Sequence, residues 1–189
     1  MLKRLLDIIL LLIFSPVLIL IFLFVSFLIY IFDGRPIIFK QKRCGHFCKE
    51  FNIYKFRTMR IESKKKKNSD LERITQVGKF LRLTSLDEIP SFYNVLIGNM
   101  TLVGPRPLIQ EYLHYYTKYQ IKRHDVKPGI TGLAQINPDP SGLKSWKQSI
   151  KLDIYYATKL SLYLDIKILF KTIILILFKQ KQYNDFKKF

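Results

Sequence analysis

Cysteine is scarce in this chain. Its 189 residues include two cysteines, Cys44 and Cys48, which excludes a framework of several disulfide bonds. The stretch from Cys44 to Cys48 also contains His46, so three side chains that can bind a metal lie within five residues. A zinc site normally needs a fourth ligand and a second cluster of ligands, and none is evident in the sequence. We therefore interpret this stretch as a turn with two reduced thiols.

Acidic residues are also few. Asp and Glu number 14 against 32 Lys and Arg, which gives a formal net charge of +18. Such an excess suits nucleic acid, anionic lipid headgroups or phosphorylated substrates. The hydrophobic content of 49% is high for a basic nucleic-acid binder, and no helix-turn-helix, zinc-finger or RNA-recognition signature occurs. The composition therefore favours a membrane surface or a phosphorylated substrate.

One hydrophobic run is long. Residues 8–32 are 25 residues without a charge. As a helix rising 1.5 Å per residue, the run would reach about 38 Å, against a hydrocarbon core of about 30 Å. It is too long for a secretory signal peptide, and no small-residue cleavage site follows it. Basic residues flank it on both sides. The run therefore predicts a segment that enters a bilayer.

Two arrangements fit this run. Pro16 removes a backbone hydrogen bond and bends a helix, and the Ser15 hydroxyl can occupy the carbonyl that is left free. Because basic flanks prefer the cytoplasmic side, a helix that enters, bends at Ser15-Pro16 and returns places both flanks correctly. A tilted spanning helix with a tolerated kink is the alternative. We predict the re-entrant arrangement, with Asp7 pairing with Lys3 or Arg4 near the interface.

The rest of the chain predicts short mixed elements. In chain order, we expect a β-hairpin from 36–41 and 51–56, a solvated loop at Lys64–Lys67, a helix at 73–83, a tyrosine-rich helix after Glu111, a strand at 132–136, a turn at 137–142, a helix through 146–156 and an interfacial helix at about 160–178. The fold class is thus α+β, a helix-dominated monotopic membrane protein. Residues 1–33 form the membrane helix, and residues 34–189 form a cytosolic, membrane-associated domain.

An acidic pair carries the clearest functional signal. Ser85 with Glu88 three residues later matches a capping box, and the helix that follows is expected to bury Leu86, Ile89, Phe92, Tyr93 and Leu96. Capping alone would explain an isolated motif of this kind. However, Asp87 adjoins Glu88, Arg82 lies five residues earlier, and Arg106 stands between two prolines. Arginine suits phosphate recognition and carboxylates suit Mg²⁺, so this set predicts a phosphoryl-transfer site.

Seven stretches occur in a characteristic order. They are Phe14-Ser15-Pro16, Tyr54-Lys55-Phe56-Arg57-Thr58-Met59, Thr84-Ser85-Leu86-Asp87-Glu88-Ile89-Pro90, Tyr93-Asn94-Val95-Leu96, Leu102-Val103-Gly104-Pro105-Arg106-Pro107-Leu108, Arg123-His124-Asp125-Val126-Lys127-Pro128-Gly129-Ile130-Thr131-Gly132 and Leu152-Asp153-Ile154-Tyr155-Tyr156. From about Lys3 to Thr172 the chain resembles the bacterial sugar transferases, specifically the small monotopic phosphoglycosyl transferases. The resemblance implies transfer of a sugar phosphate from a UDP-sugar to undecaprenyl phosphate, a polyprenol phosphate, with release of UMP. The expected location is the bacterial inner membrane, with the catalytic domain on its cytoplasmic face.

The resemblance also implies roles for particular residues. Asp87 would be the nucleophile that forms a covalent phosphosugar intermediate, with Mg²⁺ bound nearby. Glu88 would be a metal neighbour or a base. The residues implied to contact phosphates or to support the site are Lys55, Arg82, Arg106 and Asp153. The helix break would lie at Ser15-Pro16. Membrane lipid is an expected partner, nucleic acid is not, and a homodimer is left open.

Three positions depart from the family pattern, namely Asn99, Pro138 and Lys151. None touches the acidic pair or the arginine loop, so the reaction class stands, but the donor sugar and the glycan pathway stay undetermined. Two rival hypotheses are a basic scaffold that only sits on membranes and a membrane-tethered nucleic-acid binder. The scaffold leaves the acidic pair and the arginines without a shared purpose, and the basic residues are too spread out to indicate a nucleic-acid binder.

Overall fold

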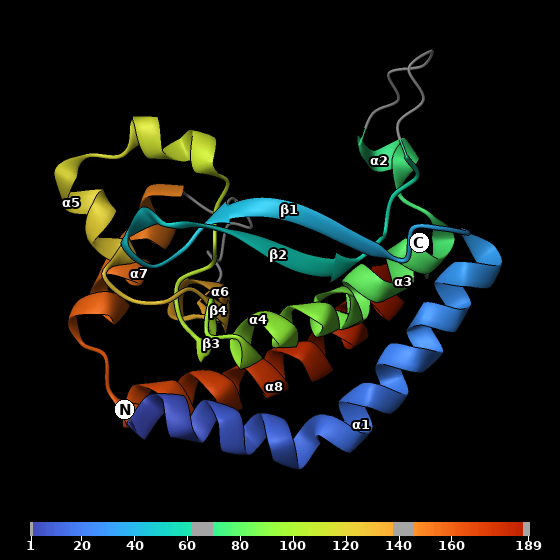
Figure 1. Ribbon diagram of the computed structural model, residues 1–189, viewed down its shortest axis with the longest axis horizontal. Helices are drawn as coiled ribbons and strands as arrows, with labels where there is room; N and C mark the ends of the chain where they lie inside the picture. The colour runs from blue at the N-terminus through green and yellow to red at the C-terminus, as the bar shows by residue number, and fades with distance from the viewer. Residues whose placement is uncertain (1, 62–69, 138–145, 187–189) are drawn as a thin grey trace.

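The structure, a computed structural model, describes residues 2–61, 70–137 and 146–186 (Figure 1). Within these residues helices dominate, and four strands form two separate two-stranded sheets. The predicted class, helix-dominated α+β, is confirmed at this level. Figure 1 shows the hairpin β1–β2 across one face and the helices α1 (Leu2–Phe32) and α8 (Leu162–Phe186) along the opposite face.

Helix α1 is continuous over 31 residues and contains Pro16. Figure 1 shows that it bends near its middle. The Ser15 hydroxyl donates to the Leu12 carbonyl at 2.8 Å, which is the carbonyl that a proline at position 16 cannot bond. The expected role of Ser15 is therefore confirmed. Among the described residues α1 is the one helix long and apolar enough to cross a membrane, judged by length and composition. Its re-entrant path stays a prediction.

The N-terminal end of α1 is tied to the rest of the fold. Lys3 Nζ contacts the Asp165 carboxylate at 2.6 Å, and the Arg4 guanidinium donates to the backbone carbonyls of Val95 and Leu96. The expected pairing of Asp7 with Lys3 or Arg4 is wrong. Buried Asp7 instead accepts a hydrogen bond from the Thr101 hydroxyl at 2.7 Å, because packing of α1 against β3 places these groups together.

The C-terminal end of α1 is tied to the same body. Buried Arg57 donates to the backbone carbonyls of Asp33, Gly34 and Arg35, which follow the helix. The Thr75 hydroxyl donates to the Asp33 carboxylate at 2.7 Å. Both ends of the bent helix therefore contact the folded domain.

The predicted hairpin is confirmed. Strands β1 (Ile38–Cys44) and β2 (Glu50–Phe56) pair in antiparallel register, with Ile38 opposite Phe56. A single 3₁₀ turn, η1 (His46–Cys48), connects them. Arg43 lies opposite Phe51 in this register, and side chains two residues apart on a strand share a face, so Arg43, Phe51, Ile53 and Lys55 lie on one face of the hairpin and Phe56 on the other. Phe51, Ile53 and Phe56 are buried.

The central segment differs in part from the prediction. Its elements are α2 (Asp70–Arg73), α3 (Gln76–Thr84), η2 (Leu86–Ser91) and α4 (Phe92–Leu96). The predicted helix at 73–83 begins at Gln76, where the Thr75 side chain accepts from the Gly78 amide. The predicted capping box is wrong, because Ser85 has a left-handed backbone (φ 59°) that ends α3 and its side chain caps no helix. Of the expected buried stripe, Tyr93 and Leu96 are exposed.

The following segment also departs from the prediction. The tyrosine-rich stretch is divided between η3 (Gln110–Tyr115) and α5 (Lys118–Ile121), and η4 (Lys122–His124) follows. The strand expected at 132–136 is wrong, because α6 (Leu133–Ile136) occupies it and the strand β4 (Gly129–Thr131) precedes it. Strand β4 pairs in parallel with β3 (Thr101–Val103), and paired residues such as Thr101 and Gly129 are 28 positions apart. A pattern of neighbouring residues therefore could not indicate this pairing.

The two C-terminal helices lie where the sequence predicted them. Helix α7 (Trp146–Thr158) covers the helix predicted through 146–156, and α8 includes the helix predicted at about 160–178. Lys167 and Lys171 of α8 are exposed as expected, whereas Asp165 is buried. The loop predicted at Lys64–Lys67 and most of the turn predicted at 137–142 lie outside the described residues.

Two hydrophobic clusters form the core, and α1 contributes to both. Leu11, before the bend, packs in a cluster with Phe51, Val103 and Ile168. Val25 and Ile29, after the bend, pack in a second cluster with Phe56, Leu81 and Ile89. The bend therefore lets one helix cover two parts of the domain, while many of its other large apolar side chains stay exposed.

Candidate active site

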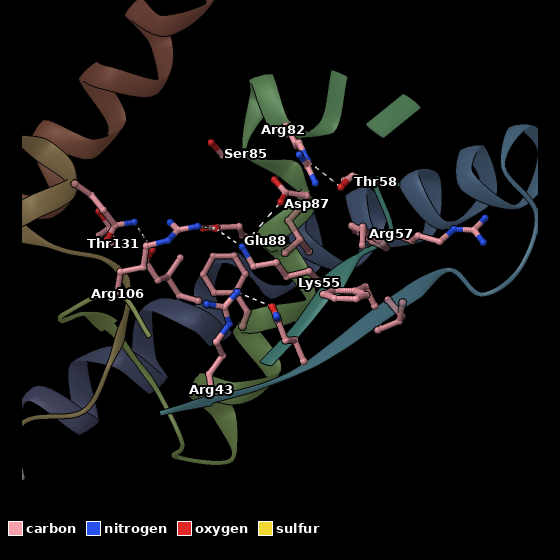
Figure 2. A pocket seen from close by; sticks show the side chains of 18 of the residues that line it. Arg43, Lys55, Arg57, Thr58, Arg82, Ser85, Asp87, Glu88, Arg106 and Thr131 are labelled. Atoms are coloured by element: carbon pink, nitrogen blue, oxygen red, sulfur yellow. Dashed lines mark hydrogen bonds and ion pairs between the residues drawn. The ribbon is translucent and has the colours of Figure 1, made fainter. Parts of the chain in front are cut away.

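The acidic pair lies in a cavity of about 1380 Å³. Asp87 and Glu88 belong to the first turn of η2, directly after the left-handed residue Ser85. Strands β1 and β2, helix α3, the segment around Arg106 and helix α8 supply the other walls. Of the six residues predicted for the site itself, the structure brings five to this cavity, namely Lys55, Arg82, Asp87, Glu88 and Arg106 (Figure 2).

Glu88 joins two cations. Its Oε1 atom accepts from Lys55 Nζ at 2.6 Å and from the Arg106 guanidinium at 3.2 Å (Figure 2). Burial by itself would raise the pKa of Glu88, but Arg106 and Lys55 together outweigh it and hold the pKa below its ordinary value. Glu88 is thus a carboxylate that positions two cations. This environment suits a base poorly, because a lowered pKa weakens proton capture.

Asp87 has a different environment. One of its carboxylate oxygens lies 4.0 Å from Lys55 Nζ, and its side chain is 15% exposed. Burial raises the pKa of Asp87 above its ordinary value, and the nearby Lys55 opposes this effect only in part. Its negative charge is therefore incompletely balanced by the protein. A desolvated carboxylate of this kind can act as a nucleophile or as a ligand for a hard cation.

Magnesium fits this arrangement. Mg²⁺ takes oxygen ligands and is usually held by one or two carboxylates together with substrate phosphates. Asp87 supplies such an oxygen and lines a cavity large enough for further ligands. Glu88 is less available to a cation, because Lys55 and Arg106 already share its Oε1 atom.

Close backbone packing places Arg82. A Cβ atom on Gly78 would lie 2.0 Å from the Thr58 carbonyl oxygen, so only glycine lets α3 approach the end of β2 this closely. One helical turn later, Arg82 Nε donates to the Thr58 hydroxyl at 2.9 Å (Figure 2). This bond holds the guanidinium near Asp87 at the cavity wall.

The arginine loop is fixed by strand β4. The Gly104 amide donates to the Thr131 carbonyl at 2.8 Å, and the Gly129 amide donates to the Pro105 carbonyl at 3.0 Å. A Cβ atom on Gly129 would lie 2.0 Å from the Gly104 nitrogen, so the two segments touch through their backbones. Pro105 is buried, while the Arg106 side chain is 50% exposed and reaches Glu88. The backbone thus presents a guanidinium that Glu88 holds in position.

The structure does not bring Asp153 to the cavity, so the expected contact of Asp153 with substrate phosphate has no geometric support. Its carboxylate is buried and pairs with the Arg123 guanidinium at 2.6 Å. Arg123 also donates to the Arg106 carbonyl at 2.8 Å. Asp153 therefore contributes indirectly, by holding the arginine that supports the Arg106 loop.

Two arginines were not predicted as site residues. Arg43 lines the cavity, and burial together with nearby Arg106 lowers its pKa. Arg43 lies 12 residues before Lys55, so the sequence alone did not indicate that both line one cavity. The register of the hairpin brings them near each other. Arg123 is fully buried and supports the site through its neighbours. It stood within a stretch that carried the family resemblance, which was the available signal.

Helix α8 gives the cavity an apolar wall. The residues that it contributes are Leu169, Thr172, Ile173, Leu175 and Ile176. Cationic and acidic groups from β2, η2 and the arginine loop face the other side. The cavity can thus hold a phosphorylated group beside an apolar chain.

Comparisons with known proteins agree with this geometry. The model of the bacterial sugar transferase family matches residues 1–179. The chain belongs to the bacterial sugar transferase family. Family membership accounts for the order of the motifs and makes the chain a transferase. The scaffold and nucleic-acid hypotheses gave no reason for that order.

Several relatives have informative names. An uncharacterized sugar transferase, EpsL, of Bacillus subtilis is 48% identical over 142 residues, which cover 74% of this chain and 69% of the relative. The UDP-glucose:undecaprenyl-phosphate glucose-1-phosphate transferase of Escherichia coli is 40% identical, over 92% of this chain and 39% of the relative. An N-acetylgalactosaminephosphotransferase of Aeromonas hydrophila that is named for UDP-N-acetylgalactosamine and undecaprenyl phosphate is 36% identical, over 90% of this chain and 42% of the relative. The chain therefore spans about two fifths of the length of these last two sugar transferases.

Proposed function

We propose that this protein transfers a sugar 1-phosphate from a UDP-sugar to a polyprenol phosphate and releases UMP. The observation that carries the proposal is the acidic pair with Lys55 and Arg106 in a cavity whose other wall is apolar. The names of the relatives support the reaction class, since they act on undecaprenyl phosphate with sugar donors.

The first step uses Asp87 as the nucleophile. An Oδ atom of Asp87 attacks the β-phosphorus of the donor, the bond from that phosphorus to the bridging oxygen breaks, and UMP leaves with that oxygen. The product is a sugar phosphate joined covalently to Asp87. Asp87 suits this role better than Glu88 because its carboxylate is less engaged by cations and its raised pKa indicates a more basic oxygen.

The second step returns the carboxylate. A phosphate oxygen of the polyprenol phosphate attacks the same phosphorus, the bond between phosphorus and Asp87 breaks, and a polyprenyl diphosphate sugar leaves. The Asp87 carboxylate is a good leaving group from this acyl phosphate, so the difficult transfer is divided into two easier ones.

Cations at the cavity wall stabilise the charge that these steps create. Lys55 and Arg106 are held in place by Glu88, and Arg82 is held by Thr58. Such preorganised donors lower the barrier because they need no rearrangement during the reaction. Mg²⁺ held by Asp87 and the donor diphosphate would supply further charge neutralisation.

We propose that the protein lies on the cytoplasmic face of the bacterial inner membrane with α1 as a re-entrant helix. Both ends of α1 contact the same domain, through Lys3 and Arg4 at one end and Asp33 at the other. A straight spanning helix would place these ends on opposite sides of the bilayer. The apolar residues of α8 that line the cavity would then lie where a polyprenol chain can reach from the bilayer.

The test omits the lipid acceptor. Purified protein in detergent is incubated with Mg²⁺ and a panel of labelled UDP-sugars, and intact mass is measured. We expect a phosphosugar adduct that polyprenol phosphate removes. Asp87→Asn should lose the adduct and lower turnover by about 1000-fold or more, since an essential nucleophile is removed. Asp125→Asn, at an exposed position, is the matched control and should keep both.

The outcomes separate the parts of the proposal. UMP release on lipid addition without any adduct would retain the transferase and reject the covalent intermediate. Adduct formation in the Asp87→Asn protein would assign the nucleophile to another residue. Absence of both adduct and UMP with every donor, in a protein shown to be folded, would favour a membrane scaffold.

A further inference from the structure

The turn between β1 and β2 meets a histidine that is far away in the sequence. Cys44 ends β1, Cys48 ends η1, and His124 ends η4. The two Sγ atoms and an imidazole nitrogen all lie within 4.8 Å of one another. Cys44 and His124 are buried, and Cys48 is partly exposed. The sequence suggested no third ligand outside this turn, because His124 is 76 residues beyond Cys48.

The imidazole of His124 is oriented like that of a metal ligand. Its Nδ1 atom lies 3.2 Å from the Gly45 carbonyl oxygen, which can only accept a hydrogen bond. The proton therefore belongs on Nδ1, and Nε2 keeps its lone pair. Nε2 is buried and has no hydrogen-bond partner among the described residues. A backbone carbonyl that fixes one nitrogen while the other stays available is the usual arrangement of histidine ligands to metals.

We propose that Cys44, Cys48 and His124 bind one zinc ion, with water as the fourth ligand. Thiolates and imidazole are the ligands that zinc prefers in proteins. In a tetrahedral site with zinc–sulfur bonds of about 2.3 Å, the ligand atoms are about 3.6–3.8 Å apart. The three ligand atoms therefore need to approach one another by about 1 Å or less from the spacing seen here. Solvent can reach the fourth position from the side of Cys48.

The charges of such a site balance. Zinc binding releases one proton from each thiol and leaves two thiolates on a divalent cation. The resulting complex has no net charge, so its burial beside Arg123 does not place an unpaired charge in the interior.

The zinc would act as a clamp that supports the active site. Figure 1 shows the turn of the hairpin beside α5 and α7, at the end of the hairpin remote from α3. The hairpin carries Lys55, and Arg123, next to His124, donates to the Arg106 carbonyl. A zinc ion bound by Cys44, Cys48 and His124 would thus join two parts of the site. One is the hairpin, which carries Lys55, and the other is the segment of Arg123, which supports Arg106. This inference stands independently of the covalent mechanism.

The experiment measures metal directly. The full chain is purified in detergent without chelators, and zinc per chain is determined by plasma mass spectrometry. We expect about one zinc per chain, a value below about 0.1 in Cys48→Ser and His124→Gln, and an unchanged value in the control His114→Gln. His114 is an exposed histidine of η3 and controls for binding to surface histidines.

A second readout tests the ligands in the wild-type protein, so the conclusion does not depend on variants that fold poorly. Zinc is removed by a chelator under reducing conditions and replaced by Co²⁺. A thiolate-to-cobalt charge-transfer band and slower alkylation of both thiols support the site. Failure of the reduced wild-type protein to take up zinc or cobalt overturns it. An intact mass lower by two hydrogen atoms after purification under reducing conditions also overturns it, because that mass shows a disulfide.

Discussion

At the scale of single residues, Asp87 and Glu88 have opposite electrostatic environments although they are neighbours in the chain. Glu88 accepts from Lys55 and Arg106, and its pKa lies below its ordinary value. Asp87 lies farther from Lys55, and burial raises its pKa. The difference arises because successive residues of a 3₁₀ turn point in different directions. One carboxylate therefore positions cations, and the other is available for chemistry.

The role of Glu88 can be tested by removing its charge. Glu88→Gln keeps the shape but weakens the bonds that hold Lys55 and Arg106. Hydrogen bonds to charged groups contribute about 1.5–3 kcal/mol, so we expect kcat/KM to fall about 10- to 100-fold. Steady-state kinetics with the preferred donor measures this fall. Glu50→Gln is the control, since its pair with Lys42 is on the surface. Unchanged kinetics in Glu88→Gln would contradict the positioning role.

The pKa of Asp87 predicts the acid limit of activity. The raised pKa means that Asp87 is protonated at higher pH than an ordinary aspartate, whose pKa is 3.8. A protonated carboxylic acid is a poor nucleophile, so the rate of adduct formation should fall as pH decreases through a midpoint above 3.8. The second-order rate constant of adduct formation, measured at donor concentrations far below saturation over a pH series, reports the free enzyme and gives this midpoint. A midpoint at or below 3.8 would contradict the desolvated environment of Asp87.

At the scale of elements, the bend of α1 at Pro16 lets one helix pack against two hydrophobic clusters. Pro16 leaves the Leu12 carbonyl without its helical partner, and Ser15 supplies one. The helix therefore stays continuous through its bend. Its two halves can then contribute Leu11 to one hydrophobic cluster and Val25 to the other.

Substitution of Pro16 tests the path of α1. Pro16→Ala restores the amide that can bond the Leu12 carbonyl, so we expect a straighter helix and a partly spanning population. The measurement is protease accessibility of an N-terminal epitope tag in intact spheroplasts. The tag should be protected in the parent protein and partly cleaved in Pro16→Ala. Val17→Ala, at an exposed neighbouring position, is the control. Cleavage of the tag in the parent protein would reject the re-entrant path.

At the scale of the whole molecule, residues from both ends of the chain share a buried network. Asp165 of α8 accepts from Lys3 at 2.6 Å and from the Tyr156 hydroxyl at 2.6 Å. The N-terminal half of α1 is thereby fixed to α7 and α8, and the same α8 lines the cavity. The long apolar helix α1 and the candidate active site are thus parts of one packed body.

Lys3→Ala tests this connection. Loss of the lysine leaves the Asp165 carboxylate buried with Tyr156 as its remaining partner in this network. Breaking a buried ion pair can cost 3–5 kcal/mol, and because Lys3 is partly exposed we expect about 1–3 kcal/mol. Thermal unfolding in detergent should give a lower Tm than for the parent protein. Lys167→Ala, at an exposed position on the same helix α8, should leave the Tm unchanged. An unchanged Tm in Lys3→Ala would show that the pair does not hold α1.

The sequence predicted features that depend on neighbouring residues. The hairpin followed from β-branched and aromatic runs around a polar turn, and the Ser15 bond followed from the position of Pro16. The acidic pair, Lys55, Arg82 and Arg106 were identified from motifs, and the structure places all five at one cavity. The capping box at Ser85 failed because the sequence cannot show that this residue has a left-handed backbone.

Tertiary structure alone decided the features that join distant residues. Asp7 bonds Thr101, Asp153 pairs with Arg123 away from the cavity, and His124 lies beside Cys44 and Cys48. The sequence by itself determined the family, the hydrophobic helix and the reactive motifs, because spacing and side-chain chemistry are local properties. Partners of buried charged groups depend on which elements pack together. Burial makes an unpaired charge costly, so these groups find partners wherever the fold supplies them, irrespective of separation along the chain.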